Sequence, residues 1–180
     1  MATPAGHTLT GLILYRAIEK KGSKLLTPGL LFFVIMSNLS DLDYVPGLLM
    51  GNAHAFHRGF THTLFFVLLV SGLSAWVGPW MGLERQRAAW IGGLCCLSHL
   101  VIDLFTADWK APYGVPLFWP FLERTFISPV ALFLPPSKGS LRDLFQPWNL
   151  LVVFMECVVL IPFLFLLELK AGKDGRREVE

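Results

Sequence analysis

Residues 38–63 read NLSDLDYVPGLLMGNAHAFHRGFTHT, and this stretch separates two strongly apolar segments. It holds three of the five His residues of the chain and a closely spaced pair of carboxylates. Asp41 and Asp43 lie between the apolar residues 25–36 and Pro46, so they are predicted to end a helix rather than lie inside it. Side chains that can bind metal are therefore expected at this helix end.

Other side chains of the same chemistry lie next to other apolar runs. His57 and His62 flank a short turn, and His62 opens the following apolar run. His99 and Asp103 are four positions apart near the end of another run, so a helix would place their Cβ atoms about 5–6 Å apart on one face. His7, at the start of the first helical segment, adds another imidazole.

The composition indicates an integral membrane protein. Hydrophobic residues make up 54% of the 180 residues and charged residues only 16%, which is too apolar for an ordinary soluble domain. A compact soluble helical enzyme is the alternative. The net charge of +2 and the scattered basic residues give no indication of nucleic-acid binding. Because the chain is so apolar, the lipid bilayer is the expected partner. The three Cys residues lie inside apolar runs and are predicted to be buried hydrophobic side chains.

The fold class predicted from the apolar runs is an all-α, multi-pass membrane helix bundle with about five helical segments. The segment at 63–82 has no formal charge over twenty residues and is the clearest spanning candidate. The predicted helical segments are 7–18, 28–40, 63–82, 88–106 and 149–167. One membrane-embedded domain over residues 1–169 and a basic, polar cytoplasmic tail at 170–180 are expected.

A long region rich in Pro and aromatic residues separates the last two helical segments. It covers residues 107–147 and includes YGVPLFWPF at 113–121, so it cannot form one helix. It is predicted to be a loop with short interfacial turns that lies over the site as a lid or forms a hydrophobic docking surface.

The distribution of basic residues predicts the orientation in the membrane. If the helices alternate in direction, ten Lys and Arg residues collect on one side and five on the other. The richer side is predicted to be cytoplasmic. On the same alternation the candidate ligands all fall at the opposite, non-cytoplasmic end of the helices: His7, Asp41, Asp43, His57, His62, His99 and Asp103.

Four His and three Asp at one end favour a metal site. Zinc and manganese are the expected ions, and seven ligands exceed the needs of one tetrahedral ion, so two ions are plausible. A pair of ions activates water and stabilises both oxygens of a phosphoryl or acyl transfer. Arg58 could orient an anionic phosphoester. Glu156, inside the last segment, could be a ligand, a general acid or base, or a partner of Arg58.

Each candidate also has a purely structural interpretation. Asp41 and Asp43 could simply terminate a helix, because Asp is favoured in turns. His99 and Asp103 could form a hydrogen-bonded pair in the bundle, and Glu156 could be protonated and hydrogen-bonded there. The joint convergence favours the metal site. His54 aligns with none of the other ligands and is predicted to be a surface or auxiliary residue.

The motifs follow one another in a specific order. The first is an N-terminal His before a small residue, His7 and Gly11, and the second is D-x-D at Asp41 and Asp43. HRG-x-TH at 57–62, H-x-x-x-D at His99 and Asp103, and YGVPLFWPF at 113–121 follow. As an ordered set they resemble the YdjM-like family of membrane-bound, metal-dependent hydrolases. The resemblance covers most of the chain up to residue 121, and Ser40 departs from it where Pro would be expected.

The resemblance implies a helical multi-pass protein of the cytoplasmic (inner) membrane with a metal-dependent hydrolase site at those His and Asp positions. More distantly, it suggests the zinc-dependent phospholipase C type of helical hydrolase. It implies no substrate.

The leading hypothesis is a membrane-bound hydrolase that cleaves a lipid-linked or amphiphilic phosphoester with one or two His- and Asp-bound ions. A metal-ion transporter is an alternative, although it predicts polar residues throughout the membrane depth. A haem-binding helix bundle is another, although haem does not require the three Asp residues.

Overall fold

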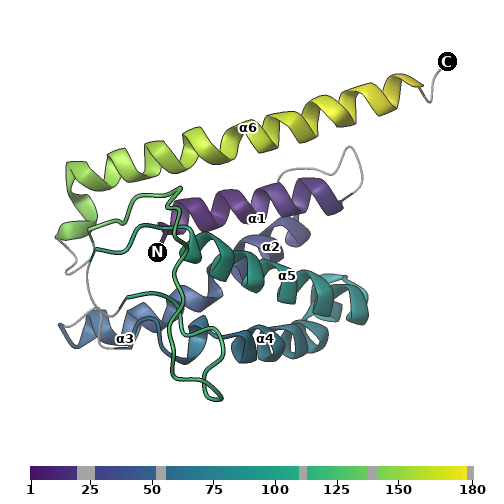
Figure 1. Ribbon diagram of the computed structural model, residues 1–180. Helices are drawn as coiled ribbons and strands as arrows, with labels where there is room; N and C mark the ends of the chain where they lie inside the picture. Colours follow the sequence, from purple (N-terminus) through teal and green to yellow (C-terminus); the bar gives the residue numbers. More distant parts are fainter. Residues whose placement is uncertain (20–26, 52–55, 110–112, 138–141, 178–180) are drawn as a thin grey trace.

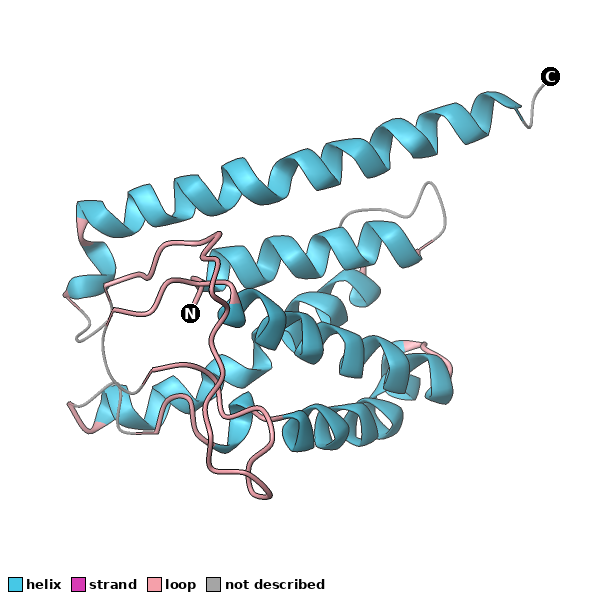
Figure 2. Cartoon of the chain, viewed as in Figure 1, coloured by secondary structure: helices cyan, strands magenta, loops and turns pink. Residues whose placement is uncertain are grey.

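The chain folds into a bundle of helices with one long irregular connection (Figure 1). The computed structural model describes residues 1–19, 27–51, 56–109, 113–137 and 142–177. The α-helices are α1 (Pro4–Ile18), α2 (Pro28–Asn38), α3 (Tyr44–Leu49), α4 (Leu64–Val77), α5 (Arg85–Leu104) and α6 (Pro147–Arg177). Short 3-10 helices cover Leu39–Asp43, Phe60–His62, Gly78–Met81 and Asp143–Phe145. Within the described residues there is no strand, as Figure 2 shows, so the all-α prediction is confirmed.

Three helices are long and apolar enough to cross a membrane: Leu64–Met81, Arg85–Leu104 and Pro147–Lys170. Most of the large apolar side chains of α4 and α6 are exposed, as lipid-facing residues are; Leu68 and Phe154 are examples. The structure therefore confirms the predicted multi-pass arrangement. It also extends α6 to Arg177, so residues 170–177 of the predicted tail are helical.

Capping residues explain why α1 and α5 begin earlier than the apolar pattern predicts. The Thr3 side chain accepts a hydrogen bond from the Gly6 backbone, and Pro4 then occupies the first helical position, where its missing N–H is no loss. Glu84 accepts from the backbone N–H groups at the start of α5 in the same way. As a result His7 lies in the first turn of α1.

The short helix α3 lies outside the predicted segments. The preceding helical segment is predicted to end near Ser40 with Asp41 and Asp43 after it, whereas a helix resumes at Tyr44 with Pro46 as its third residue. A Pro in the first turn costs no backbone hydrogen bond, so the chain continues as helix through this position.

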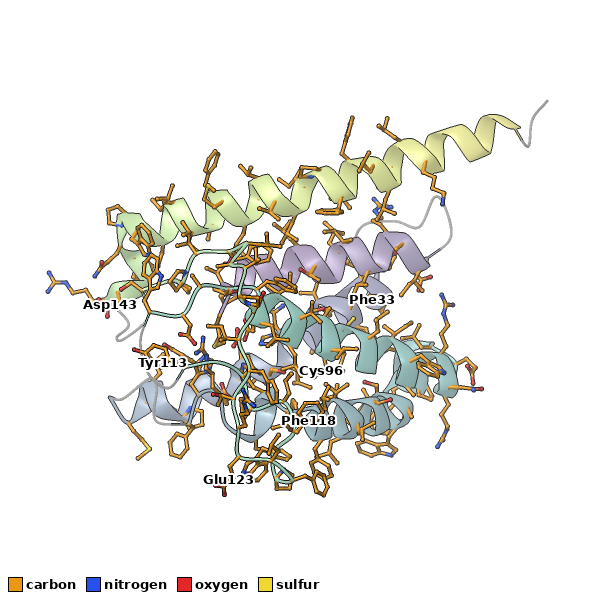
Figure 3. All side chains as sticks on the ribbon, viewed as in Figure 1. Phe33, Cys96, Tyr113, Phe118, Glu123 and Asp143 are labelled. Atoms are coloured by element: carbon orange, nitrogen blue, oxygen red, sulfur yellow. The ribbon has the colours of Figure 1, made fainter. Side chains whose placement is uncertain are left out.

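The buried core lies where α1, α2, α4 and α5 meet. It contains Tyr15, Phe32, Phe33, Met36, Val70, Ala88, Ile91, Cys95 and Cys96. Figure 3 places Phe33 and Cys96 inside the bundle. The prediction of buried Cys side chains is confirmed for Cys95 and Cys96, and Cys157 is half-buried. Helix α6 packs against α1 on the outside of this core (Figure 1).

The described residues of the connection between α5 and α6 are irregular, as predicted, apart from the short 3-10 helix before α6. Val115 and Phe126 exchange two backbone hydrogen bonds, and Ala107 donates one to the Phe133 carbonyl. The Leu64 N–H, at the start of α4, donates to the Leu117 carbonyl. These bonds fasten the loop to the end of the bundle at which α4 begins and α5 ends.

Candidate metal centre

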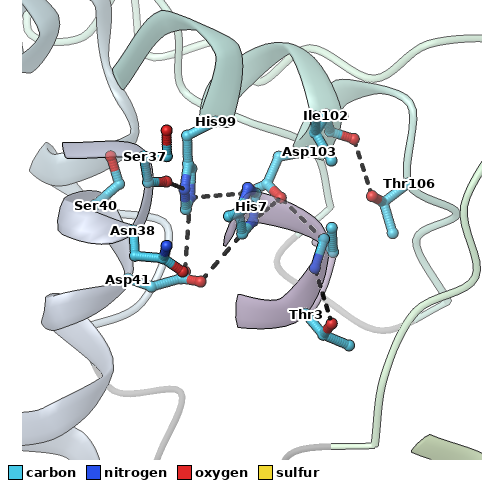
Figure 4. Close-up of polar contacts among 12 residues, drawn as sticks. Thr3, His7, Ser37, Asn38, Ser40, Asp41, His99, Ile102, Asp103 and Thr106 are labelled. Atoms are coloured by element: carbon cyan, nitrogen blue, oxygen red, sulfur yellow. Dashed lines mark hydrogen bonds and ion pairs between the residues drawn. The ribbon is translucent and has the colours of Figure 1, made fainter. Parts of the chain in front are cut away.

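Separate segments bring predicted ligands together at one end of the bundle. Figure 4 shows His7, Asp41, His99 and Asp103 among them. The first turn of α1 carries His7, and the 3-10 helix after α2 carries Asp41. His62 ends the short 3-10 helix before α4, and the last turns of α5 carry His99 and Asp103. The predicted convergence from alternating helices is therefore what the structure shows for these five side chains.

Three ligand atoms are spaced as a metal ion requires. His62 Nε2 lies 3.4 Å from His99 Nε2 and 3.4 Å from Asp103 Oδ2, and the latter two atoms are 3.6 Å apart. A tetrahedral zinc ion with bonds of about 2.1 Å separates its ligand atoms by about 3.4 Å. All three side chains are buried. These residues match the geometry of one face of a zinc site.

Asp41 joins this group from its more open side. Its Oδ1 lies 3.6 Å from His99 Nε2 and 3.8 Å from His62 Nε2, and its Oδ2 lies 3.9 Å from His7 Nε2. The Asp41 side chain is 16% exposed, whereas those of the other residues named here are fully buried. Any small molecule that reaches the cluster past these side chains would therefore meet Asp41.

The candidate ligands form three overlapping groups. Besides His62, His99 and Asp103, the groups are His7 with Asp41 and His99, and Asp41 with His57 and His62. A carboxylate can bridge two ions, whereas one imidazole nitrogen binds only one. The shared His residues therefore limit how many ions could bind at once, and the cluster suits one ion or a carboxylate-bridged pair.

Buried polar atoms without partners support the fit to a cation. Both ring nitrogens of His7 and Oδ2 of Asp103 lack a hydrogen-bond partner among the residues that the structure describes. The His7 ring instead stacks on the His99 ring, with the centroids 3.6 Å apart. Burying such groups without partners is costly, and a divalent cation would relieve that cost.

Hydrogen bonds on the far side of two imidazoles turn their Nε2 atoms toward the cluster. His99 Nδ1 donates to the Ser37 carbonyl oxygen at 2.9 Å. His62 Nδ1 lies 3.2 Å from Asp43 Oδ2. Metal-binding His residues usually have such a partner, because it selects the tautomer and orients the ring.

Asp43 lies behind the ligand atoms rather than among them. Its carboxylate accepts from His57 Nδ1 at 2.8 Å and from the Thr61 hydroxyl, in addition to its contact with His62. Burial alone would raise the pKa of Asp43, but the hydrogen bonds and charges of His57 and His62 hold it well below its usual range. Asp43, a predicted ligand, is thus placed to orient the two His residues.

The electrostatics of His62 follow from the same contacts. Burial alone would lower its pKa, but the nearby carboxylates of Asp103 and Asp43 outweigh burial and raise the pKa to about 9. In the absence of a metal ion, two carboxylates therefore favour a proton on this ring.

Arg58 is tied to the long loop. It adopts a left-handed backbone conformation, with φ of 60°, and its Nη1 donates to Asp108 Oδ2. The same oxygen accepts from the Gly114 N–H at 2.7 Å. Sequence reasoning missed Asp108, and no spacing signal could have found it, because it lies fifty positions from its partner.

Glu156 lies outside the three ligand groups. Its buried carboxylate accepts from the Thr3 N–H at 2.6 Å and from the Thr3 hydroxyl. Among its predicted roles, the structure shows neither a ligand position nor a pair with Arg58. His54 lies outside the described residues.

Comparisons with known proteins agree with the membrane fold. The family model described as YdjM inner membrane protein matches residues 1–172. The inner membrane protein YbcI of Escherichia coli strain K12 is 34% identical over 113 residues, which cover 60% of this chain and 63% of YbcI. No solved structure matches the chain. Because the family model covers nearly all of the sequence, this chain belongs to the YdjM inner membrane protein family.

Proposed function

We propose that this protein is a metal-dependent hydrolase of the inner membrane that cleaves a phosphoester in a lipid-linked or amphiphilic substrate. The observation that carries the proposal is the buried triangle of His62 Nε2, His99 Nε2 and Asp103 Oδ2, with mutual distances of 3.4–3.6 Å. A divalent cation, zinc or manganese, fits these ligands. When bound, it would supply Lewis acidity and lower the pKa of water.

The remaining side chains have distinct proposed roles. Asp41, partly exposed beside the triangle, would complete the ligand set and could bridge a second ion, for which His7 is placed. Two divalent ions with Asp41 and Asp103 would leave a net positive charge, which attracts a phosphate anion. We propose that Arg58 orients this anion, since a guanidinium has five N–H donors and can bind it alongside Asp108.

The surroundings of the site support an amphiphilic substrate. Next to Asp41 and Asp43, the side chains of Leu42, Val45 and Leu49 are exposed. Their spacing places them on one side of a helical segment, and an exposed apolar face of this kind suits the interior of a bilayer. A substrate with an acyl or prenyl chain could lie against it.

We further propose that the site faces the non-cytoplasmic side. Glu19, Arg87 and Arg16 lie at the end of the bundle opposite to the candidate metal centre, where Arg87 bonds Glu19 at 2.9 Å. That end carries the majority of the basic residues by sequence, as cytoplasmic ends do.

The test combines metal analysis with activity. Protein purified in mild detergent is analysed for metal per chain, for wild type, His99→Ala and Asp103→Ala. One or two ions per wild-type chain, lost in the variants together with hydrolysis of phosphoesters presented in mixed micelles, would support the proposal. Phosphoester cleavage that survives in metal-free protein would refute it.

A further inference from the structure

Helix α1 begins without an acidic residue of its own. Its first turn contains none, although the positive end of a helix dipole favours a nearby anion. The first N–H groups of a helix also need partners, and in a membrane water does not supply them. A hydrogen-bond acceptor comes instead from α6, because the buried carboxyl group of Glu156 lies at this helix start.

The contact is a chain of hydrogen bonds. Glu156 accepts from the backbone N–H and the hydroxyl of Thr3, and the Thr3 oxygen in turn accepts from the Gly6 N–H at 3.3 Å. A Cβ at Gly6 would lie 2.8 Å from the Glu156 Cδ, so the absence of a side chain there lets the carboxylate approach. Glu156 of α6 thereby helps to fix the α1 start, together with Asp103 of α5, whose Oδ1 accepts from the Ala2 N–H at 3.1 Å.

The next residue of α1 is His7, whose ring lies in the ligand cluster. His7 Nε2 is 3.4 Å from Asp103 Oδ1, but the ring nitrogens have no hydrogen-bond partner within the described parts of the chain. His62 and His99 are oriented by Asp43 and Ser37, whereas His7 lacks such a bond. Apart from the His99 ring on which it stacks, its placement therefore depends on the backbone of α1.

We propose that Glu156 is a positioning residue of the metal centre, which caps α1 from α6 and thereby holds His7 among the ligands. The inference deepens the proposed function, because it assigns the source of one ligand's orientation. It gives Glu156 a role without contact to the ion or the substrate.

The experiment measures metal affinity in detergent-solubilised full-length protein by competition with a chromogenic chelator for Zn²⁺. Glu156→Leu is expected to weaken binding of the ion that His7 contacts by about 10–100-fold, as loss of an orienting group does. Glu156→Gln, which can still accept from the Thr3 N–H and donate to the Thr3 oxygen, is expected to restore most of the affinity. Glu168→Leu is the matched control, since Glu168 is also on α6 but pairs with Arg16 far from the site.

A double-mutant cycle separates this role from general stabilisation of the bundle. If Glu156 acts through His7, His7→Ala combined with Glu156→Leu binds zinc no more weakly than His7→Ala alone. Additive losses would overturn the inference. The visible spectrum of Co²⁺-loaded protein gives a second readout. It is expected to change in the same way in His7→Ala and in Glu156→Leu.

The remaining outcomes distinguish the two proposals. A zinc-binding wild type whose affinity is unchanged in Glu156→Leu overturns the role of Glu156 alone. A wild type that binds no zinc overturns both. If Glu156→Leu does not fold, Thr3→Val removes one donor to the carboxylate and is expected to weaken binding in the same direction; unchanged affinity in that variant would also overturn the inference.

Discussion

Replacing Asp43 with Asn tests whether this residue orients ligands or binds metal itself. The carboxylate serves three donors: His57 Nδ1, the Thr61 hydroxyl and His62 Nδ1. Asn offers one acceptor oxygen, and its NH₂ group would face an imidazole nitrogen. A ring in that position must accept with Nδ1 and carry its proton on Nε2, where it can no longer bind a cation.

The expected loss is a factor of about 10–100 in metal affinity, which is typical for removal of a group that orients a metal ligand. It corresponds to about 1.4–2.7 kcal/mol. The assay is chelator competition with Zn²⁺ at neutral pH, with Glu168→Gln as the control because that carboxylate is half exposed and pairs with Arg16.

Two results would refute this reasoning in different ways. Wild-type affinity in Asp43→Asn would mean that neither His57 nor His62 depends on this carboxylate for its orientation. Complete loss of one stoichiometric ion would identify Asp43 as a direct ligand, as the spacing of the D-x-D motif predicts.

The remaining predictions concern packing, pH and the long loop. Gly92→Ala is expected to destabilise the protein by about 1–3 kcal/mol, because the new Cβ would lie 1.8 Å from the Ser74 Oγ and force α4 and α5 apart. Thermal unfolding measures this loss. Gly72→Ala is the control, since a Cβ there meets no neighbour within 4 Å among the described residues and should not destabilise the protein comparably. Zinc affinity is expected to rise as pH increases toward about 9, because the ion must displace the proton that His62 holds below that pKa. An affinity that is independent of pH in that range would contradict the assignment of His62. Asp108→Ala is expected to speed tryptic cleavage at the exposed Arg124, because it releases both Arg58 and the Gly114 N–H; an unchanged cleavage rate would show that the loop is held elsewhere.

The sequence predicted the long helices because their signal is local. Uncharged runs such as 63–82 leave little alternative to a membrane helix, and α4 lies there. The ends were less predictable, since they depend on caps such as Thr3 and Glu84 that apolar periodicity does not register. The helix α3 was missed because it has only six residues and follows the Asp pair that was predicted to end the preceding helix.

The site was predictable as a set of residues but not as a set of contacts. Alternating helices place every predicted ligand at one end, and the order of the helical segments is enough to predict this. Which carboxylate faces the cluster depends on helix rotation by fractions of a turn, so the position of Asp43 behind His62 could not be predicted from the sequence. The partners of Arg58 and Glu156 lie 50 and 153 positions away and leave no local pattern.

The separation of the ligands along the chain has a consequence for biosynthesis. His7 and Asp103 lie 96 positions apart, and every ligand group described here needs residues from at least two separate segments. A protein made from its N-terminus exposes His7 long before α5 exists. An ion could therefore be held between α1 and α5 only after the ribosome has delivered α5 to the membrane, so binding to His99 and Asp103 would be a late step in the maturation of this protein.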